Sequence, residues 1–180
     1  LGTLRHARVP AILMLGEKDP EATLLALQAG LLRGMTHFKV KVGLASSPEE
    51  DAALVKRLRA AIGPTGHLAA DANMAWTAPQ AIRFLRALPA GALDYLEQPV
   101  ADDDLGAMAQ VAAASSCPIC VDEGLHAAQD IVAHAKARAA SGAGLKAIKL
   151  GGVRPTAAAG APARGPGGRP APGPQSPRSS

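Results

Sequence analysis

Aromatic residues are almost absent from this sequence, which has one Trp, one Tyr and two Phe among 180 residues. No basic patch carries interleaved aromatic rings, so the stacking surface of a typical single-strand nucleic-acid binder is missing. No apolar run reaches the roughly 18 residues of a membrane span, and the first residues lack the pattern of a secretory signal. We therefore expect a cytoplasmic protein with no nucleic-acid and no membrane partner.

Acidic residues are missing from one part of the chain, residues 154–180, and this explains the formal charge of +4. That segment carries four arginines, whereas residues 1–153 carry equal numbers of basic and acidic side chains. The high pI of about 9.4 thus describes the end of the chain. It is poor evidence for binding to a polyanion.

The same segment, from Arg154 onward, contains no Leu, Ile, Val or Phe and is rich in Pro, Gly, Ala, Arg and Ser. Such a composition buries too little apolar surface to offset the entropy lost on ordering. We expect a barrel-like domain over residues 1–153 and a disordered tail over residues 154–180. A natural low-complexity tail and a change of reading frame in a GC-rich gene both remain open as its origin.

Cysteine is scarce too, with Cys117 and Cys120 as the two examples, in a Cys-Pro-Ile-Cys motif. A redox pair of this spacing usually opens a helix, whereas this one leads into a strand-like run. One pair is also only half of a structural zinc site. We expect two small buried residues without a chemical role.

What the sequence does contain is a regular alternation of short strand-like runs with helical stretches, typical of βα units around a parallel sheet. The expected strands are residues 9–15, 37–42, 68–72, 92–96, 118–122 and 146–150. The expected helices are residues 20–33, 48–62, 81–88, 103–114 and 127–140. The helix over 48–62 has the sharpest boundaries, because Ser47 and Glu50 form a capping box and Gly63 follows its last residue.

Two lysines occupy one face of the second expected strand. In Phe38-Lys39-Val40-Lys41-Val42 the apolar residues point one way and the lysines the other. If helices cover the apolar face, both lysines point into the barrel. Buried cations are unfavourable without anions, so carboxylates or a charged ligand are expected on neighbouring strands.

Three acids fit this requirement: Asp71, Glu97 and Asp122 each end a predicted strand. Intervals of 30, 26 and 25 residues separate Lys41, Asp71, Glu97 and Asp122, and Lys149 on the sixth expected strand follows 27 residues later. Barrel active sites form at these carboxyl ends. Three oxygen donors without His or Cys favour Mg²⁺, with Mn²⁺ as an alternative, although ordinary strand-end ion pairs are the simpler interpretation of any one acid.

Together these motifs closely resemble the enolase superfamily, and within it the muconate lactonizing enzyme subgroup. The resemblance covers about residues 9–152. It is carried by Lys39-Val40-Lys41, Asp71-Ala72-Asn73, Glu97-Gln98-Pro99, Asp122-Glu123 and Ile148-Lys149. It implies an α/β fold, a partial TIM (β/α)8 barrel of about six βα units, since a complete barrel typically needs about 250 residues.

The resemblance also implies a reaction, the Mg²⁺-dependent removal of the proton α to a carboxylate through an enediolate. It makes Lys41 the base on one face of the substrate, Lys39 the neighbour that lowers its pKa, and Lys149 the group on the opposite face. It assigns Asp71, Glu97 and Asp122 to the metal. Asn73 and Glu123 are expected to support these ligands from outside the metal shell.

Several alternatives remain open. The lysine and acid set is shared by racemases, epimerases, cycloisomerases and o-succinylbenzoate synthases, so the reaction on the small carboxylate substrate is not chosen, and a homo-oligomer is possible. A non-catalytic truncated fragment, without the capping domain and the last barrel strands, is the competing hypothesis. Trp76 and His126 are expected to serve packing or solvation.

Overall fold

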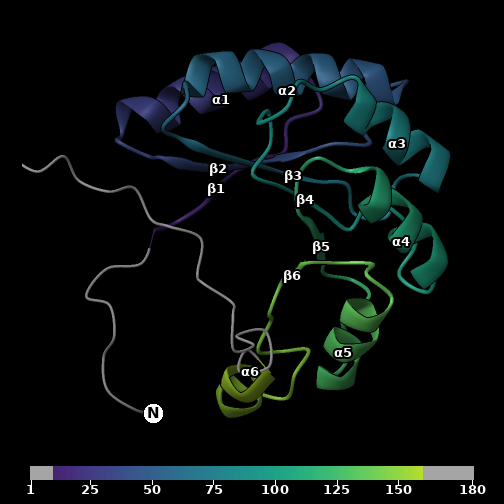
Figure 1. The fold of residues 1–180 in the computed structure, drawn as a ribbon. Helices are drawn as coiled ribbons and strands as arrows, with labels where there is room; N and C mark the ends of the chain where they lie inside the picture. The colour runs from purple at the N-terminus through teal and green to yellow at the C-terminus, as the bar shows by residue number, and fades with distance from the viewer. Residues whose placement is uncertain (1–9, 160–180) are drawn as a thin grey trace, which may run out of the picture.

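The structure is a computed structural model that describes residues 10–159. Six parallel strands form one sheet in the order β1-β2-β3-β4-β5-β6, with sequential neighbours paired throughout. The strands are β1 Leu13–Leu15, β2 His37–Lys41, β3 His67–Asp71, β4 Tyr95–Glu97, β5 Ile119–Val121 and β6 Gly142–Ala143. The sheet curves, and the helices lie along its outer side (Figure 1). This is the predicted partial barrel of six βα units.

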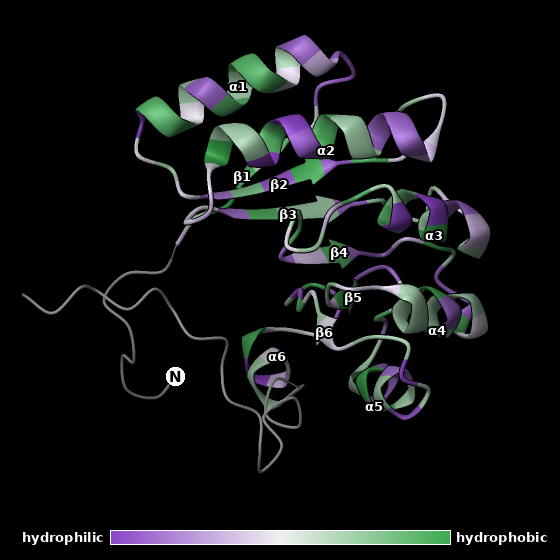
Figure 2. Cartoon of the chain, turned by 45° about the horizontal axis from the view of Figure 1, so that its top comes forward, coloured by the Kyte–Doolittle hydropathy of each residue, from purple (hydrophilic) through white to green (hydrophobic). Residues whose placement is uncertain are grey.

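Helices alternate with these strands, as predicted. They are α1 Pro20–Leu32, α2 Pro48–Ile62, α3 Ala78–Arg86, α4 Leu105–Ala114, α5 Ala128–Lys136 and α6 Val153–Ala159. Asp19 caps α1 and Ser47 caps α2 through side-chain hydrogen bonds to first-turn N–H groups. Along α2 and α3 hydrophilic and hydrophobic residues alternate (Figure 2), because one side of each helix faces the sheet. Within residues 10–159, every helix is too short or too polar to cross a membrane.

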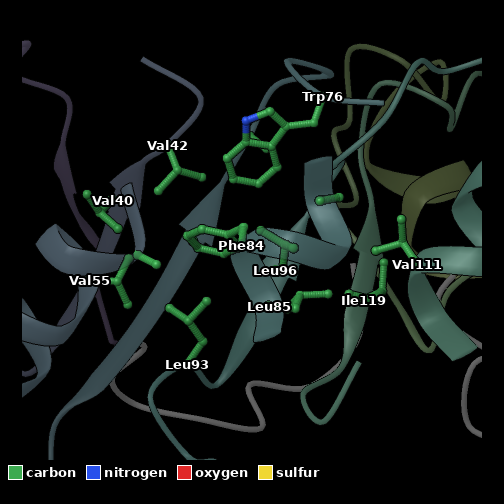
Figure 3. Packing of buried hydrophobic residues seen from close by; sticks show 14 of the residues in the cluster. Val40, Val42, Val55, Trp76, Phe84, Leu85, Leu93, Leu96, Val111 and Ile119 are labelled. Carbon is green, nitrogen blue, oxygen red and sulfur yellow. The ribbon is translucent and has the colours of Figure 1, made fainter. Parts of the chain in front are cut away.

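The hydrophobic core fills the space between the outer face of the sheet and the helices (Figure 3). Phe38, Val40 and Val42 are buried there, as the alternation in the second strand predicted. Lys39 is half-buried and Lys41 exposed on the other face. The core therefore sets the direction of both lysines, since a shift of one residue would exchange the two faces.

Five of the six predicted strands are confirmed to within a few residues, but the sixth is wrong. Residues 147–150 form a turn, and β6 lies earlier, at Gly142–Ala143. The prediction followed the apolar pattern around Ile148, whose side chain is 91% exposed. Gly142 and Ala143 carry too little side chain to produce a strand pattern, so the backbone pairing with β5 reveals them.

The structure also differs from the predicted domain boundary between residues 153 and 154. Residues 154–159, expected in the disordered tail, lie in helix α6. Alanine at residues 157–159 favours a helix even where no apolar face is available. Residues 160–180 lie outside the described part of the chain, and for them the tail stays a prediction.

Candidate active site

The candidate site begins with Lys39, which lies between two carboxylates at the ends of the next two strands. Its Nζ atom is 2.6 Å from Glu97 Oε1 and 3.2 Å from Asp71 Oδ2. Asp71 and Glu97 face each other directly in the β3–β4 register, and each is 5% exposed. The buried cation predicted from the strand alternation is thus matched by the predicted acids.

These charges are unequally compensated, since one ammonium serves two carboxylates. Burial lowers the pKa of Lys39, but the bonds to Glu97 and Asp71 outweigh it, so the net shift is upward and the ammonium stays charged. Burial raises the pKa of the Glu97 carboxyl, Lys39 offsets this in part, and the charges of Asp71 and Asp122 add to it. Around Lys39 two carboxylates therefore share one ammonium, and this part of the site would accept a further cation.

Lys41 is placed differently from its strand neighbour. It stands opposite Asp71 in the β2–β3 register, but its ammonium makes no ion pair within residues 10–159. Its side chain is exposed and lines a cavity of about 350 Å³ with Glu17 of the loop after β1 and Asp51 of helix α2. A free amine at the rim is available for a substrate, as a base must be.

Asp122 is the third acid and receives two lysines. It is 1% exposed; Lys149 Nζ donates to its backbone oxygen over 2.9 Å and to Oδ1 over 3.2 Å, and Lys146 Nζ bonds Oδ2. Burial raises the pKa of this carboxyl, but the bonds from Lys146 and Lys149 outweigh burial and lower it overall. Lys149, predicted on a sixth strand, reaches Asp122 from a turn.

Lys146 was missed by the sequence analysis. Cys120 pairs with Gly142, and a Cβ on Gly142 would lie 2.6 Å from the Cys120 sulfur, so Gly142 faces the inside of the barrel. By alternation, residue 146 continues this inner face beyond the end of β6. The interval from Asp122 to Lys146 is 24 residues, which continues the preceding intervals of 26 and 25 and was the available signal.

Gln98 was also missed, although it directly follows Glu97 in the sequence. It is 1% exposed, and its Oε1 atom accepts from the N–H groups of Asp122 at 2.9 Å and Gly124 at 3.2 Å. Its Nε2 donates to Val100 O over 3.0 Å. Gln98 has a φ of 36°, a conformation that persists only where the surroundings hold it. It ties the end of β4 to the loop that carries Asp122.

Asn73 and Glu123, which were expected to support the metal ligands, lie beside the acids. Asn73 Nδ2 donates to Glu123 Oε1 over 3.0 Å, and its backbone N–H donates to Asp71 Oδ1 over 3.1 Å. The other carboxylate oxygen, Glu123 Oε2, is buried and accepts no hydrogen bond within the described residues. A buried oxygen without a donor is costly, which marks this place as one where a ligand is expected.

Whether these residues suit a metal ion follows from the chemistry of the donors. In residues 10–159 no group of three or more His, Cys, Asp or Glu side chains is gathered closely enough to hold an ion, and lysine ammoniums lie against all three acids. The donors themselves, carboxylate oxygens on three consecutive strand ends, are those that Mg²⁺ prefers. The raised pKa of Glu97, caused by burial and by the other acids, and the unpaired Glu123 oxygen also fit a divalent cation.

The remaining conspicuous residues behave as simple packing or surface groups. Trp76 is 7% exposed and packs on Phe84 with ring centroids 4.7 Å apart, which confirms the packing interpretation. Cys117 and Cys120 are free and partly buried, and burial raises the pKa of the Cys120 thiol to about 12. Such thiols are poor nucleophiles, so neither supports a reactive role.

Comparison with known proteins gives the family. The family described as "Enolase C-terminal domain-like" matches residues 23–173, most of the chain. The chain belongs to this family. The resemblance read from the lysine and acid motifs is thereby confirmed.

Relatives within this family carry several different activities. The chain is 30% identical over 156 residues to the N-succinyl-L-Arg/Lys racemase of Bacillus cereus, covering 86% of this chain and 42% of the relative. It is 40% identical over 122 residues to the o-succinylbenzoate synthase of Thermobifida fusca, covering 67% and 38%. The muconate cycloisomerase structure from Azorhizobium caulinodans superposes with a TM-score of 0.80 at 31% identity, covering 88% and 44%. The chain thus spans about two fifths of the length of these relatives.

Proposed function

We propose that this chain carries the reaction centre of a Mg²⁺-dependent enzyme that removes the proton α to the carboxylate of a small substrate. One observation carries the proposal: at consecutive strand ends Lys39 bridges Asp71 and Glu97, and lysines after β6 contact Asp122. Proton transfer next to a carboxylate requires a free base and nearby charges that stabilise the developing negative charge. Lys41 at the rim is the free base, and the alternating lysines and carboxylates supply the charges.

In this proposal Asp71, Glu97 and Asp122 hold the metal, and Asn73 and Glu123 keep the carboxylates in place. When bound, Mg²⁺ supplies charge stabilisation for the substrate carboxylate. The acids are already buried and fixed: Gln98 holds the backbone of Asp122, and the β3–β4 register holds Asp71 beside Glu97. This fixed arrangement lowers the reorganisation that accompanies the reaction.

Proton transfer is assigned to the lysines. Lys41, whose amine forms no ion pair within residues 10–159, takes the α-proton on one face of the substrate. Lys39 keeps its charge between Asp71 and Glu97, so it holds these two carboxylates together beside the base. On the opposite face, the geometry favours Lys146 over the predicted Lys149, because Lys146 continues the inward face of β6.

After the α-proton has left, two outcomes are compatible with this lysine pair. Return of a proton to the opposite face would give a racemase or epimerase. Departure of a β-substituent with a proton from a lysine, or opening of a ring whose oxygen leaves as a carboxylate, would give a synthase or cycloisomerase. The racemase, synthase and cycloisomerase names of the relatives span these reactions. We propose the first step that these reactions share, the removal of the α-proton. The substrate decides which step follows.

The test is α-proton exchange in D₂O with Mg²⁺, followed by NMR on a panel of N-acylamino acids and dipeptides. Lys41→Ala is expected to lower exchange by about 100-fold or more, since a positioned base contributes about 10² to 10⁴. Lys146→Ala should lower exchange strongly, and Lys149→Ala should lower it less.

The matched control is Lys56→Ala, a lysine of helix α2 on the far side of the sheet, which should leave exchange unchanged. Equal rates in Lys41→Ala and the parent would contradict the assignment of the base. A folded sample that exchanges no substrate would favour the competing hypothesis of a non-catalytic fragment.

A further inference from the structure

A cavity of about 340 Å³ opens beside the carboxylate site. Loops that follow four consecutive strands line it with Met74, Asp102, Glu123, His126 and Lys149. Lys149 bonds Asp122, and Glu123 is the next residue in the chain, so the cavity adjoins the candidate metal ligands directly. A substrate whose carboxylate sits at the acids has room here for its distal part.

The charges around this cavity are unbalanced. The Lys149 ammonium is already committed to Asp122. Glu123 accepts a hydrogen bond from the neutral amide of Asn73 and forms no ion pair within the described residues. Asp102 lies 3.5 Å from His126 Nε2, and that imidazole carries a charge only when it is protonated. Two carboxylates therefore face the cavity without a fixed counter-charge.

The shape of the cavity is set before any ligand binds. Met74 has a φ of 65°, its N–H donates to Gln98 O over 2.8 Å, and its side chain forms the apolar wall. A Cβ on Gly124 would lie 3.0 Å from Asp102 O, so glycine allows the loops after β4 and β5 to touch. An apolar wall beside two acids suits an aliphatic chain that ends in a cation.

We propose that this cavity binds a distal ammonium or guanidinium group of the substrate, and that Asp102 selects for it. The inference rests on the proposed function, because the carboxylate of the ligand is placed at the metal-binding acids. Asp102 is the selecting group because its side chain is 40% exposed at the cavity and its pairing with His126 is weak. Glu123, which also lines the cavity, adds a second negative charge.

The test is binding of Nα-acetyl-L-lysine and Nα-acetyl-L-norleucine to the full chain with Mg²⁺, measured by NMR titration. The two ligands have the same aliphatic chain and differ in the terminal ammonium. The lysine derivative is expected to bind about 10-fold more tightly, and Asp102→Asn should reduce this preference to about 2-fold or less. The control His126→Gln, at the same cavity, should keep the preference.

Equal affinity of the two ligands in the parent, binding of neither, or an undiminished preference in Asp102→Asn would each overturn the proposal. Exchange of the α-proton, followed in the same samples, separates this proposal from the proposed function. Preferential binding of the lysine derivative without exchange would contradict the proposed function alone. Exchange of both ligands with equal affinity would contradict the cavity proposal alone.

Discussion

The charge state of each side chain in the site depends on what its neighbours supply. Glu97 and Asp122 are both buried acids, yet the pKa of Glu97 is raised and that of Asp122 is lowered. Burial raises both pKa values, but Asp122 receives two lysines of its own, whereas Glu97 shares Lys39 with Asp71. The difference follows from the number of donors per carboxylate.

Lys39→Met is expected to destabilise the fold by about 3 kcal/mol at neutral pH, since it leaves two buried carboxylates without their cation. Lys41→Met in the same strand is the matched control, because the exposed Lys41 forms no ion pair within residues 10–159; its change should stay within about 0.5 kcal/mol. Urea unfolding measures both variants. Equal stability of the two variants would contradict the buried-pair description.

Strand β2 and strand β3 bring a second pair of titratable groups together, at the opposite end from the acids. His37 and His67 face each other in the register and stack with ring centroids 4.3 Å apart. Burial and the charge of His67 lower the pKa of His37, and Asp94 offsets this only in part. The fold therefore favours the neutral imidazole of His37.

The stability that His37 contributes to the fold depends on pH. Because the pKa of His37 is depressed in the fold, its contribution to stability is present above the ordinary histidine pKa of about 6.5 and is lost as pH falls through the folded value. Between about pH 7.5 and 5, the parent should lose more thermal stability than His37→Gln. His126→Gln, with a 68% exposed side chain, should track the parent. An identical loss in all three proteins would contradict the effect.

At the end of the sheet that carries His37 and His67, Arg59 joins helix α2 to the loops before β3 and β4. Arg59, near the end of α2, donates to the carbonyl oxygens of Ala92 at 3.0 Å, Gly63 at 3.2 Å and Gly66 at 2.7 Å. It also pairs with Asp94 at 2.9 Å. One side chain thus connects α2 to the loops before β3 and β4 and helps to set their register.

Arg59→Met is expected to cost about 2–3 kcal/mol of stability, because several carbonyl groups lose a charged donor. Arg57→Met, two residues earlier on the same helix, removes an exposed pair with Glu21 and should cost about 0.5 kcal/mol or less. Thermal unfolding compares the two variants directly. A similar cost for both would show that Arg59 does not join the elements.

In the whole molecule, the described residues form an arc of six strands in which β1 and β6 are the two edges. The site lies along the carboxyl ends of β2 to β6, so all its groups belong to one rim of this arc. Rims of this kind build the active sites of barrels from several strands. The consequence is that the site depends on the pairing of successive strands and not on any one loop.

The sequence predicted most of this site, because alternation and strand-end spacing are local properties of the chain. Lys39, Asp71, Glu97 and Asp122 lie as expected, since apolar residues on the other face of each strand must point to the helices. The sixth strand was mistaken because Gly142 and Ala143 carry almost no side-chain signal. The apolar residues Ile148 and Leu150 produced a strand-like pattern in a segment that forms a turn.

What the sequence by itself determined was the order of the βα units, the approximate extent of helices α1 to α5 and the acids at the strand ends, all encoded by neighbouring residues. The tertiary structure alone decided which groups pair: Lys39 with two acids, Lys146 with Asp122, and Gln98 with the backbone beyond β5. Pairing between residues distant in sequence depends on the register of neighbouring strands and on the reach of each lysine side chain. A local sequence pattern does not encode how far apart two such side chains lie in the fold.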